Sequence, residues 1–242
     1  MTSKNGVRVY LTPLEDRPLE SELMRFRLIY EGELKPSQLD PVTGKADKLS
    51  GNKHAIRKVM HRQLKALWQK NKFLREHEVY AGDYDVRPSI AEQDMDFGEW
   101  SNKKIPLVEA VAAQYHENGY VFVPLVRERW SLRCALSILL LRRDYPGGGV
   151  VEAGDLDNRI KTLIDGLRRP KNGGEIREHP VPDADETPFF CLLEDDSQIT
   201  ELRVETDTLL DEPTGANARY AKAIITVEIQ PYDVTTFNLA FA

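Results

Sequence analysis

Two acidic stretches contain the residue types that could do chemistry. The first is the run GDLDNRIKTLIDGL at 154–167, in which Asp155 and Asp157 precede Lys161. Carboxylate oxygens are the ligands that hard divalent cations prefer, and an ammonium group one helical turn farther on suits a phosphate. Aspartate is also common at the start of a helix, where it caps free N–H groups and meets the helix dipole favourably. The first stretch alone therefore leaves a helix cap and a cation site open.

The second acidic stretch is EDDSQI at 194–199, which follows the apolar run FFCLL. Such a run is typical of a short buried strand. Adjacent carboxylates at a strand end, here Asp195 and Asp196, repel each other unless they are solvated, protonated or bridged by a cation. A divalent ion shared by Asp155, Asp157 and Asp196 would remove that repulsion, so the two stretches together favour a metal site.

The element that must position Asp157 and Lys161 is an amphipathic helix. Its apolar stripe recurs at i, i+3, i+4 and i+7 and consists of Ile160, Leu163, Ile164 and Leu167. Asp157, Lys161 and Asp165 are spaced by four residues, so we expect them to share another face. Gly154 allows the chain to turn into the helix, and Asp155 or Asp157 can cap it.

The residues DLDNxxK with DGL behind them, followed by DDSQI, resemble the RusA family of Holliday-junction resolvases. The likeness covers roughly the C-terminal half of the chain. It implies a small, dimeric, Mg²⁺-dependent endodeoxyribonuclease that cuts four-way DNA junctions. The resemblance maps the catalytic carboxylates onto Asp155, Asp157 and Asp196 and the essential lysine onto Lys161.

Phosphodiester hydrolysis requires a water made nucleophilic at neutral pH and compensation of the charge on the phosphoryl oxygens. Mg²⁺, or Mn²⁺ in its place, provides both. Besides the three mapped carboxylates, we expect Asp195 to ligate the metal, orient water or support the other ligands. Lys161 would meet the phosphate as a fixed positive charge. Asn158 and Gln198 are candidates for positioning groups, and a structural role is equally open for each.

A strongly basic segment lies upstream of the motifs. Residues 45–75 contain ten Lys or Arg and one acid, a local charge of +9 in a chain of net charge −6. An apolar face at helical spacing predicts a long amphipathic helix over 53–75, and charge of a single sign favours a surface that faces phosphates. We expect His54 and His61 to support its polar face. The residues expected to contact DNA here are Lys53, Arg57, Lys58, Arg62 and Lys65.

Arginine pairs also flank the motif helix. Arg142 and Arg143 leave an apolar strand just before it, where the family resemblance places a basic exit beside the scissile phosphate. Arg168 and Arg169 follow the helix. All four are expected to bind DNA.

The pattern of elements predicts an α+β fold with a mixed, mainly antiparallel sheet, on which the motif helix and the basic helix pack. We expect a single RusA-like nuclease domain over 24–232, with an N-terminal arm at 1–23 that contains at most a short strand at 7–11. Loop-rich insertions are expected at 76–105 and 170–188, and a tail at 233–242. A short helix is predicted from 106 to 119, and the predicted strands are 26–30, 120–126, 132–141, 189–193, 200–206 and 220–230.

Composition excludes some classes. The chain of 242 residues is 41% apolar and 30% charged, and it has no apolar run near the length of a membrane span. We therefore expect a soluble cytoplasmic protein without a membrane partner or a signal peptide. Cys134 and Cys191 are isolated in apolar runs, which predicts core thiols. The acids Asp183, Asp185 and Glu186 of the second insertion are expected to be solvated.

Other functions stay open at this stage. The same fold could bind nucleic acid or serve assembly without catalysis, or it could cleave a branched substrate other than the four-way junction. A glycosyltransferase that holds a nucleotide-bound metal through Asp-x-Asp is a further class. No glycine-rich nucleotide-binding fold precedes the motif here, which argues against this class.

Overall fold

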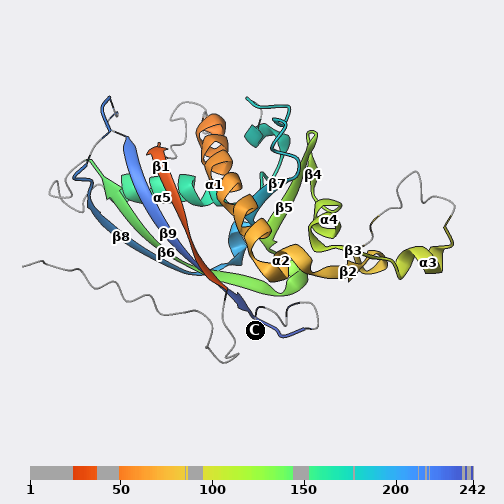
Figure 1. Cartoon of the computed structure of the whole chain (residues 1–242). Helices are drawn as coiled ribbons and strands as arrows, with labels where there is room; N and C mark the ends of the chain where they lie inside the picture. The colour runs from red at the N-terminus through yellow and green to blue at the C-terminus, as the bar shows by residue number, and fades with distance from the viewer. Residues whose placement is uncertain are drawn as a thin grey trace, which may run out of the picture.

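The computed structural model describes residues 24–36, 49–84, 86, 95–143, 153–176, 178–211, 213–215, 217, 219–235, 238 and 241. The whole N-terminal arm at 1–23, with the strand expected at 7–11, lies outside these residues. The fold belongs to the α+β class, as the sequence predicted (Figure 1).

The larger sheet has four strands in the order β1-β9-β6-β8. Antiparallel pairs join β1 to β9 and β9 to β6, whereas β6 and β8 run parallel, so the sheet is mixed. Alternate residues of β6 and β9 are buried, which is the pattern of a sheet with one face in the core. The bounds confirm four predicted strands: β1 (Arg25–Glu33), β6 (Leu132–Arg142), β8 (Ile199–Thr208) and β9 (Tyr220–Pro231).

A second sheet holds the strands that lead to the acidic stretch 194–199. It consists of β4 (His116–Glu117), β5 (Tyr120–Val126) and β7 (Phe189–Leu193), and β5 runs parallel to β7. The sequence predicted a single sheet, and this division differs from it. The chain leaves β5 through the short 3₁₀ turn η4 (Glu128–Trp130) and then Ser131 at φ 50°. That left-handed turn separates β5 from β6 although the two apolar runs are close in sequence.

Two helices place the motif and the basic segment side by side. The basic segment forms α1 (Ser50–Lys70) and α2 (Lys72–Glu76), separated at Asn71, whose side chain accepts a hydrogen bond from Leu74 N. The long helix predicted over 53–75 is therefore two helices. The motif forms α5 (Ala153–Leu167), which contacts α1. A Cβ at Gly166 would lie 2.4 Å from Ile56 Cγ2, so the close approach of α1 and α5 requires a glycine there.

The first insertion contains more regular structure than the sequence predicted. A two-stranded antiparallel sheet joins β2 (Glu78–Tyr80) to β3 (Lys104–Pro106), with η2 (Ala81–Tyr84) and α3 (Phe97–Ser101) between them. This unit projects from one side of the fold (Figure 1). The helix predicted from 106 to 119 is shorter, α4 (Leu107–Ala112). None of the helices in the described residues has the length and apolarity that crossing a bilayer requires.

Candidate functional site

The acidic residues 194–196 lie on a hydrogen-bonded turn at the end of β7. Asp195 caps the 3₁₀ turn η7 (Asp196–Gln198), because its Oδ1 accepts a hydrogen bond from Ser197 N at 3.0 Å. Gln198 is buried, and its Oε1 accepts from the backbone N–H groups of Glu194 and Asp195. Gln198 therefore has a structural role here. The turn holds the Asp195 and Asp196 carboxylates half-exposed at the carboxyl end of the strand.

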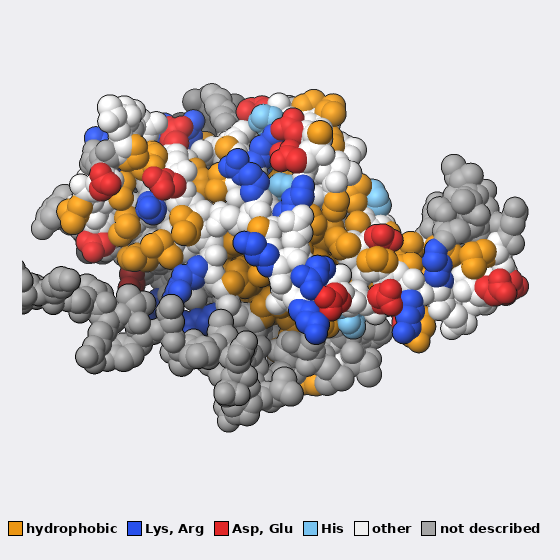
Figure 2. All heavy atoms as spheres, in the orientation of Figure 1, with side chains coloured by type: hydrophobic (Ala, Val, Ile, Leu, Met, Phe, Trp, Pro, Cys, Tyr) orange, Lys and Arg blue, Asp and Glu red, His pale blue; other side chains and the backbone are white. Residues whose placement is uncertain are grey.

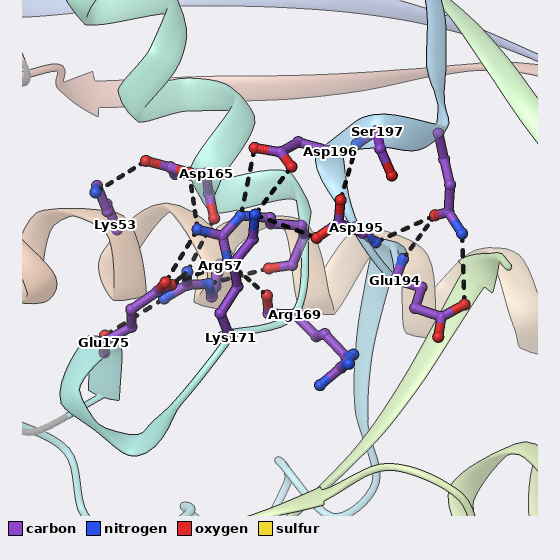
Figure 3. A network of polar contacts seen from close by, with 12 residues as sticks. Lys53, Arg57, Asp165, Arg169, Lys171, Glu175, Glu194, Asp195, Asp196 and Ser197 are labelled. Atoms are coloured by element: carbon purple, nitrogen blue, oxygen red, sulfur yellow. Dashed lines mark hydrogen bonds and ion pairs between the residues drawn. The ribbon is translucent and has the colours of Figure 1, made fainter. Parts of the chain in front are cut away.

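Cations gather on these two carboxylates. Lys171 Nζ lies 3.2 Å from Asp195 Oδ2 and 3.1 Å from Asp196 Oδ1, and Arg168 Nε is 3.9 Å from Asp196 Oδ2 (Figure 3). The N–H group of Ser197, followed by Lys171, lowers the pKa of Asp195 well below its ordinary value. The hydrogen bond to Asp196 raises the pKa of Lys171. The side chains of Lys171 and Arg168 therefore offset the repulsion expected between Asp195 and Asp196.

A buried ion network lies directly beneath this cluster (Figure 3). Arg168 donates to Asp165 Oδ1 at 2.9 Å and to Glu175 Oε1 at 3.0 Å. On α1, Arg57 pairs with Glu175 at 2.5 Å and Lys53 pairs with Asp165 at 2.8 Å. Burial acts to raise the pKa of Asp165, but Lys53 and Arg168 outweigh it and hold the pKa below its ordinary value. The network joins α1, α5 and the loop after α5 into one unit.

The motif helix presents part of the predicted set to solvent. Asp157 and Lys161 are exposed, one turn apart on α5, and Asn158 is half-buried. Asp165 was expected on the same face but is buried against α1. Each step of four residues advances about 40° around a helix, so Asp165 lies about 80° from Asp157. The helix already begins at Ala153, so Asp155 and Asp157 lie within its first turns instead of capping it.

The acids of the two motifs do not form one group in the described residues. Asp157 precedes Arg168 by eleven positions, about 16 Å along the helix axis, and Arg168 is the residue that reaches Asp196. No three His, Cys, Asp or Glu side chains converge as a metal-binding group in the part of the chain that the structure describes. The Asp155 side chain lies outside that part. The half-exposed carboxylates of Asp195 and Asp196 are oxygen ligands of the kind that a hard divalent cation binds.

The predicted DNA-contacting residues divide into three groups by exposure. Lys53, Arg57 and Arg168 are buried and ion-paired inside the protein, which leaves them no surface for a phosphate in this arrangement. Arg62 is exposed. The remaining residues are half-buried: Lys58, Lys65, Arg142, Arg143 and Arg169.

The loop 170–188 supplies the counter-charge of α1. Lys58 Nζ lies 2.7 Å from Asp183 Oδ2 and 2.9 Å from Glu186 Oε1, and Lys65 donates to the carbonyl of Asp185 at 2.8 Å. Asp183 and Asp185 are exposed as expected, but Glu186 is buried. In the space-filling view, Lys and Arg side chains follow the course of α1, with acidic side chains beside them near its upper end (Figure 2).

The two histidines of α1 belong to the core. His61 Nδ1 accepts a hydrogen bond from Phe190 N at 2.9 Å, and the ring packs on Phe189. His54 is fully buried, and its burial lowers its pKa to about 3. The sequence placed both on the polar face of the helix. The aromatic run at the start of β7 explains the difference, because it provides flat apolar partners for the imidazole rings.

A buried arginine, Arg127, lies between β5 and η4. Its side chain is fully buried, and the guanidinium carbon lies 3.8 Å from the centroid of the Trp130 ring. Burial lowers the pKa of Arg127 to about 10. It follows β5 directly, and Val126 O accepts from Glu194 N at 3.0 Å. Arg127 thus lies beneath the start of the acidic turn.

The chain matches no protein-family model, no curated protein and no solved structure.

Proposed function

We propose that this chain is a metal-dependent endodeoxyribonuclease that hydrolyses phosphodiester bonds in branched DNA. Following the resemblance to the RusA family, the preferred substrate is the Holliday junction, the acting species is a homodimer, and the processes are recombination and repair in the cytoplasm.

One structural observation supports the proposal most. Asp195 and Asp196 are held side by side on a capped turn, and Lys171 bridges them at 3.2 and 3.1 Å. Two adjacent carboxylates that already share a cation form a position with affinity for positive charge. It lies at the carboxyl end of parallel strand β7, where Asp196 is the acid that the family motif singles out.

The residues would divide the chemistry as follows. Asp195 and Asp196 would hold Mg²⁺ or Mn²⁺, which when bound supplies an activated water and compensates phosphoryl charge. The resemblance adds Asp155 and Asp157 as ligands, and an ion shared by all four acids requires the two motifs to lie closer together than Asp157 and Asp196 do here. Lys161 is exposed on α5 one turn from Asp157, so it can reach a phosphate from solvent as a fixed positive charge. Arg62 and Lys65 on α1 would hold the DNA backbone through its phosphates.

A second candidate is a nucleic-acid-binding protein of the same fold without catalysis. It is favoured by the neutralised state of the acidic turn, where Lys171 and Arg168 already balance Asp195 and Asp196. The exposed Arg62 would bind phosphates in either case.

A cleavage panel separates the two functions. Labelled four-way junction, flap, fork and linear duplex DNA would be incubated with the protein in Mg²⁺ or in EDTA. We expect Mg²⁺-dependent cleavage of branched DNA that is lost in Asp157→Asn. It should be retained in Asp207→Asn, which removes an exposed acid of β8. Binding of junctions without cleavage by any form would support the non-catalytic function.

A further inference from the structure

Lys171 differs from the other cation at the acidic turn. Arg168 is buried and is held by Asp165 and Glu175, with its Nε at 3.9 Å from Asp196. Lys171 is about half-exposed, at 49% of its side-chain surface, and its ammonium lies against both Asp195 and Asp196. Arg168 is therefore part of the scaffold, whereas Lys171 can leave the carboxylates without disturbing the core.

Lys171 and a divalent cation would bind the same carboxylate oxygens of Asp195 and Asp196. The ammonium contacts Asp195 Oδ2 and Asp196 Oδ1, and hard cations bind such carboxylate oxygens directly. An ammonium group and a divalent ion repel each other, so both cannot occupy these oxygens together. A metal that binds here has to displace Lys171.

We propose that Lys171 is the built-in counter-ion of the Asp195–Asp196 pair and competes with the divalent cation for it. This inference rests on the proposed function for the identity of the competing ion. Lys171 acts as a positioning residue: it keeps the two carboxylates together on η7 before metal binds, and it weakens the apparent affinity for metal. Lys171 lies at the start of the loop 170–188, so a residue outside the two acidic motifs controls the affinity for metal.

The fold adds a reason for this arrangement. Asp195 is fixed by its cap on Ser197 N, and Gln198 fixes the backbone of Glu194 and Asp195. The Asp195 carboxylate therefore cannot rotate away from Asp196 without losing its hydrogen bond to Ser197 N. The half-exposed Lys171 of the neighbouring loop provides the relief, and it is exchangeable because exposed ion pairs are weak.

The test is a direct measurement of Mn²⁺ binding, in which electron paramagnetic resonance reports the free ion in titrations of the full chain without DNA. Lys171→Met should bind Mn²⁺ about fivefold more tightly than the wild type, the scale expected when a weak ion pair is removed. Lys171→Arg restores a cation and should return the affinity close to the wild-type value. Adding Asp196→Asn to Lys171→Met should abolish the gain.

A matched control separates competition from a change in overall charge. Lys222→Met removes a lysine that pairs with Glu31 on the larger sheet at 3.5 Å, and it should leave Mn²⁺ affinity unchanged. An equal gain in Lys222→Met, or wild-type affinity in Lys171→Met, would overturn the inference.

Failure of the proposed function would look different. If Lys171→Met tightens Mn²⁺ binding but no form of the protein cleaves branched DNA, the counter-ion role stands and the nuclease does not. If the wild type cleaves junctions and Lys171→Met leaves Mn²⁺ affinity unchanged, the nuclease stands and the counter-ion role is wrong. Absence of Mn²⁺ binding in every variant would overturn both.

Discussion

Lys53 and Asp165 form an ion pair inside the protein, with Lys53 Nζ 2.8 Å from Asp165 Oδ2 and both side chains 8% exposed. The pair joins α1 to α5, so the basic helix and the motif helix are held by opposite charges as well as by apolar packing. Residues whose types suggested DNA contact and an exposed acidic face therefore hold the scaffold of the site together.

Removal of this buried carboxylate should destabilise the fold. Asp165→Asn leaves Lys53 and Arg168 without their shared counter-charge, and breaking a buried ion pair costs about 3–5 kcal/mol. Urea denaturation of the isolated protein would measure the loss. As a control, Arg203→Ala breaks the exposed pair with Glu205 on β8, which should cost less than about 1 kcal/mol. Equal losses in the two variants would contradict a structural role for the pair.

The sequence predicted the positions of the helices and strands well. It did not predict which charged side chains are buried in ion pairs. Strands β5 and β7 appear at the predicted residues because each is a short apolar run with clear ends. The burial of Lys53 and Arg57 could not be predicted, because their partners Asp165 and Glu175 lie more than a hundred residues away. A run of basic residues implies that their charge is balanced either by bound phosphates or by acids of the same protein. Only the tertiary fold shows which of the two balances it.

His54 should make the stability of the protein depend on pH. Its pKa is about 3 in the folded protein and 6.5 in the unfolded chain. Between these values the unfolded chain binds a proton that the folded protein does not, so stability falls as the pH falls from about 6.5 towards 3. The slope is up to about 1.4 kcal/mol per pH unit.

The comparison is between the wild type and His54→Phe, which keeps a flat ring against Phe189 and His179. Urea midpoints measured across this pH range should show a shallower dependence in the variant. Some slope should remain, because burial also lowers the pKa of His61. An identical pH dependence in both proteins would show that His54 is protonated in the folded state.

The candidate site shows the same limit of sequence reasoning. The motif spacing identified Asp195 and Asp196, and the structure places them together on η7. The spacing did not identify Lys171, because a lysine in a loop rich in Gly and Pro has no periodic signal. It also could not show that Asp165 is buried, since that depends on where α1 packs.

DNA affinity should depend on Arg62 more than on the buried cations of α1. Arg62→Ala removes an exposed guanidinium, so it should weaken junction binding and reduce the slope of log affinity against log salt by about one. Asp183→Asn should act in the opposite direction, because it removes one of the two acids that hold Lys58 and leaves Glu186 as its partner, with about a two- to threefold gain. Fluorescence anisotropy at several salt concentrations measures both effects. If both variants show the wild-type slope of log affinity against log salt, α1 is not the DNA-binding face.

Divalent cations should raise the melting temperature of the wild type. Mg²⁺ or Mn²⁺ bound to the folded state stabilises it by mass action. The double variant Asp155→Asn with Asp157→Asn should lose most of this response in a thermal scan. A rise of the same size in the double variant would assign the cation to Asp195 and Asp196 alone.

Lys161→Ala tests the proposed mechanism most directly. Lys161 is exposed on α5, and alanine is a better helix former, so the fold and the metal response should be preserved. Junction binding should also be preserved, because Arg62 and Lys65 remain. Cleavage should fall by about two to three orders of magnitude, the scale of removing one preorganised stabiliser of transition-state charge.

Two further variants complete this experiment, with single-turnover cleavage of a labelled junction as the measurement. Asp196→Asn should abolish cleavage through the metal, and its thermal response to Mg²⁺ should shrink, whereas that of Lys161→Ala should not. Lys222→Ala, an equal loss of charge on β9, should cleave at the wild-type rate. If Lys161→Ala also cleaves at that rate, Lys161 serves only as a helical partner of Asp157, because an i, i+4 pair stabilises a helix without touching substrate. The proposed role of Lys161 in catalysis would then be wrong.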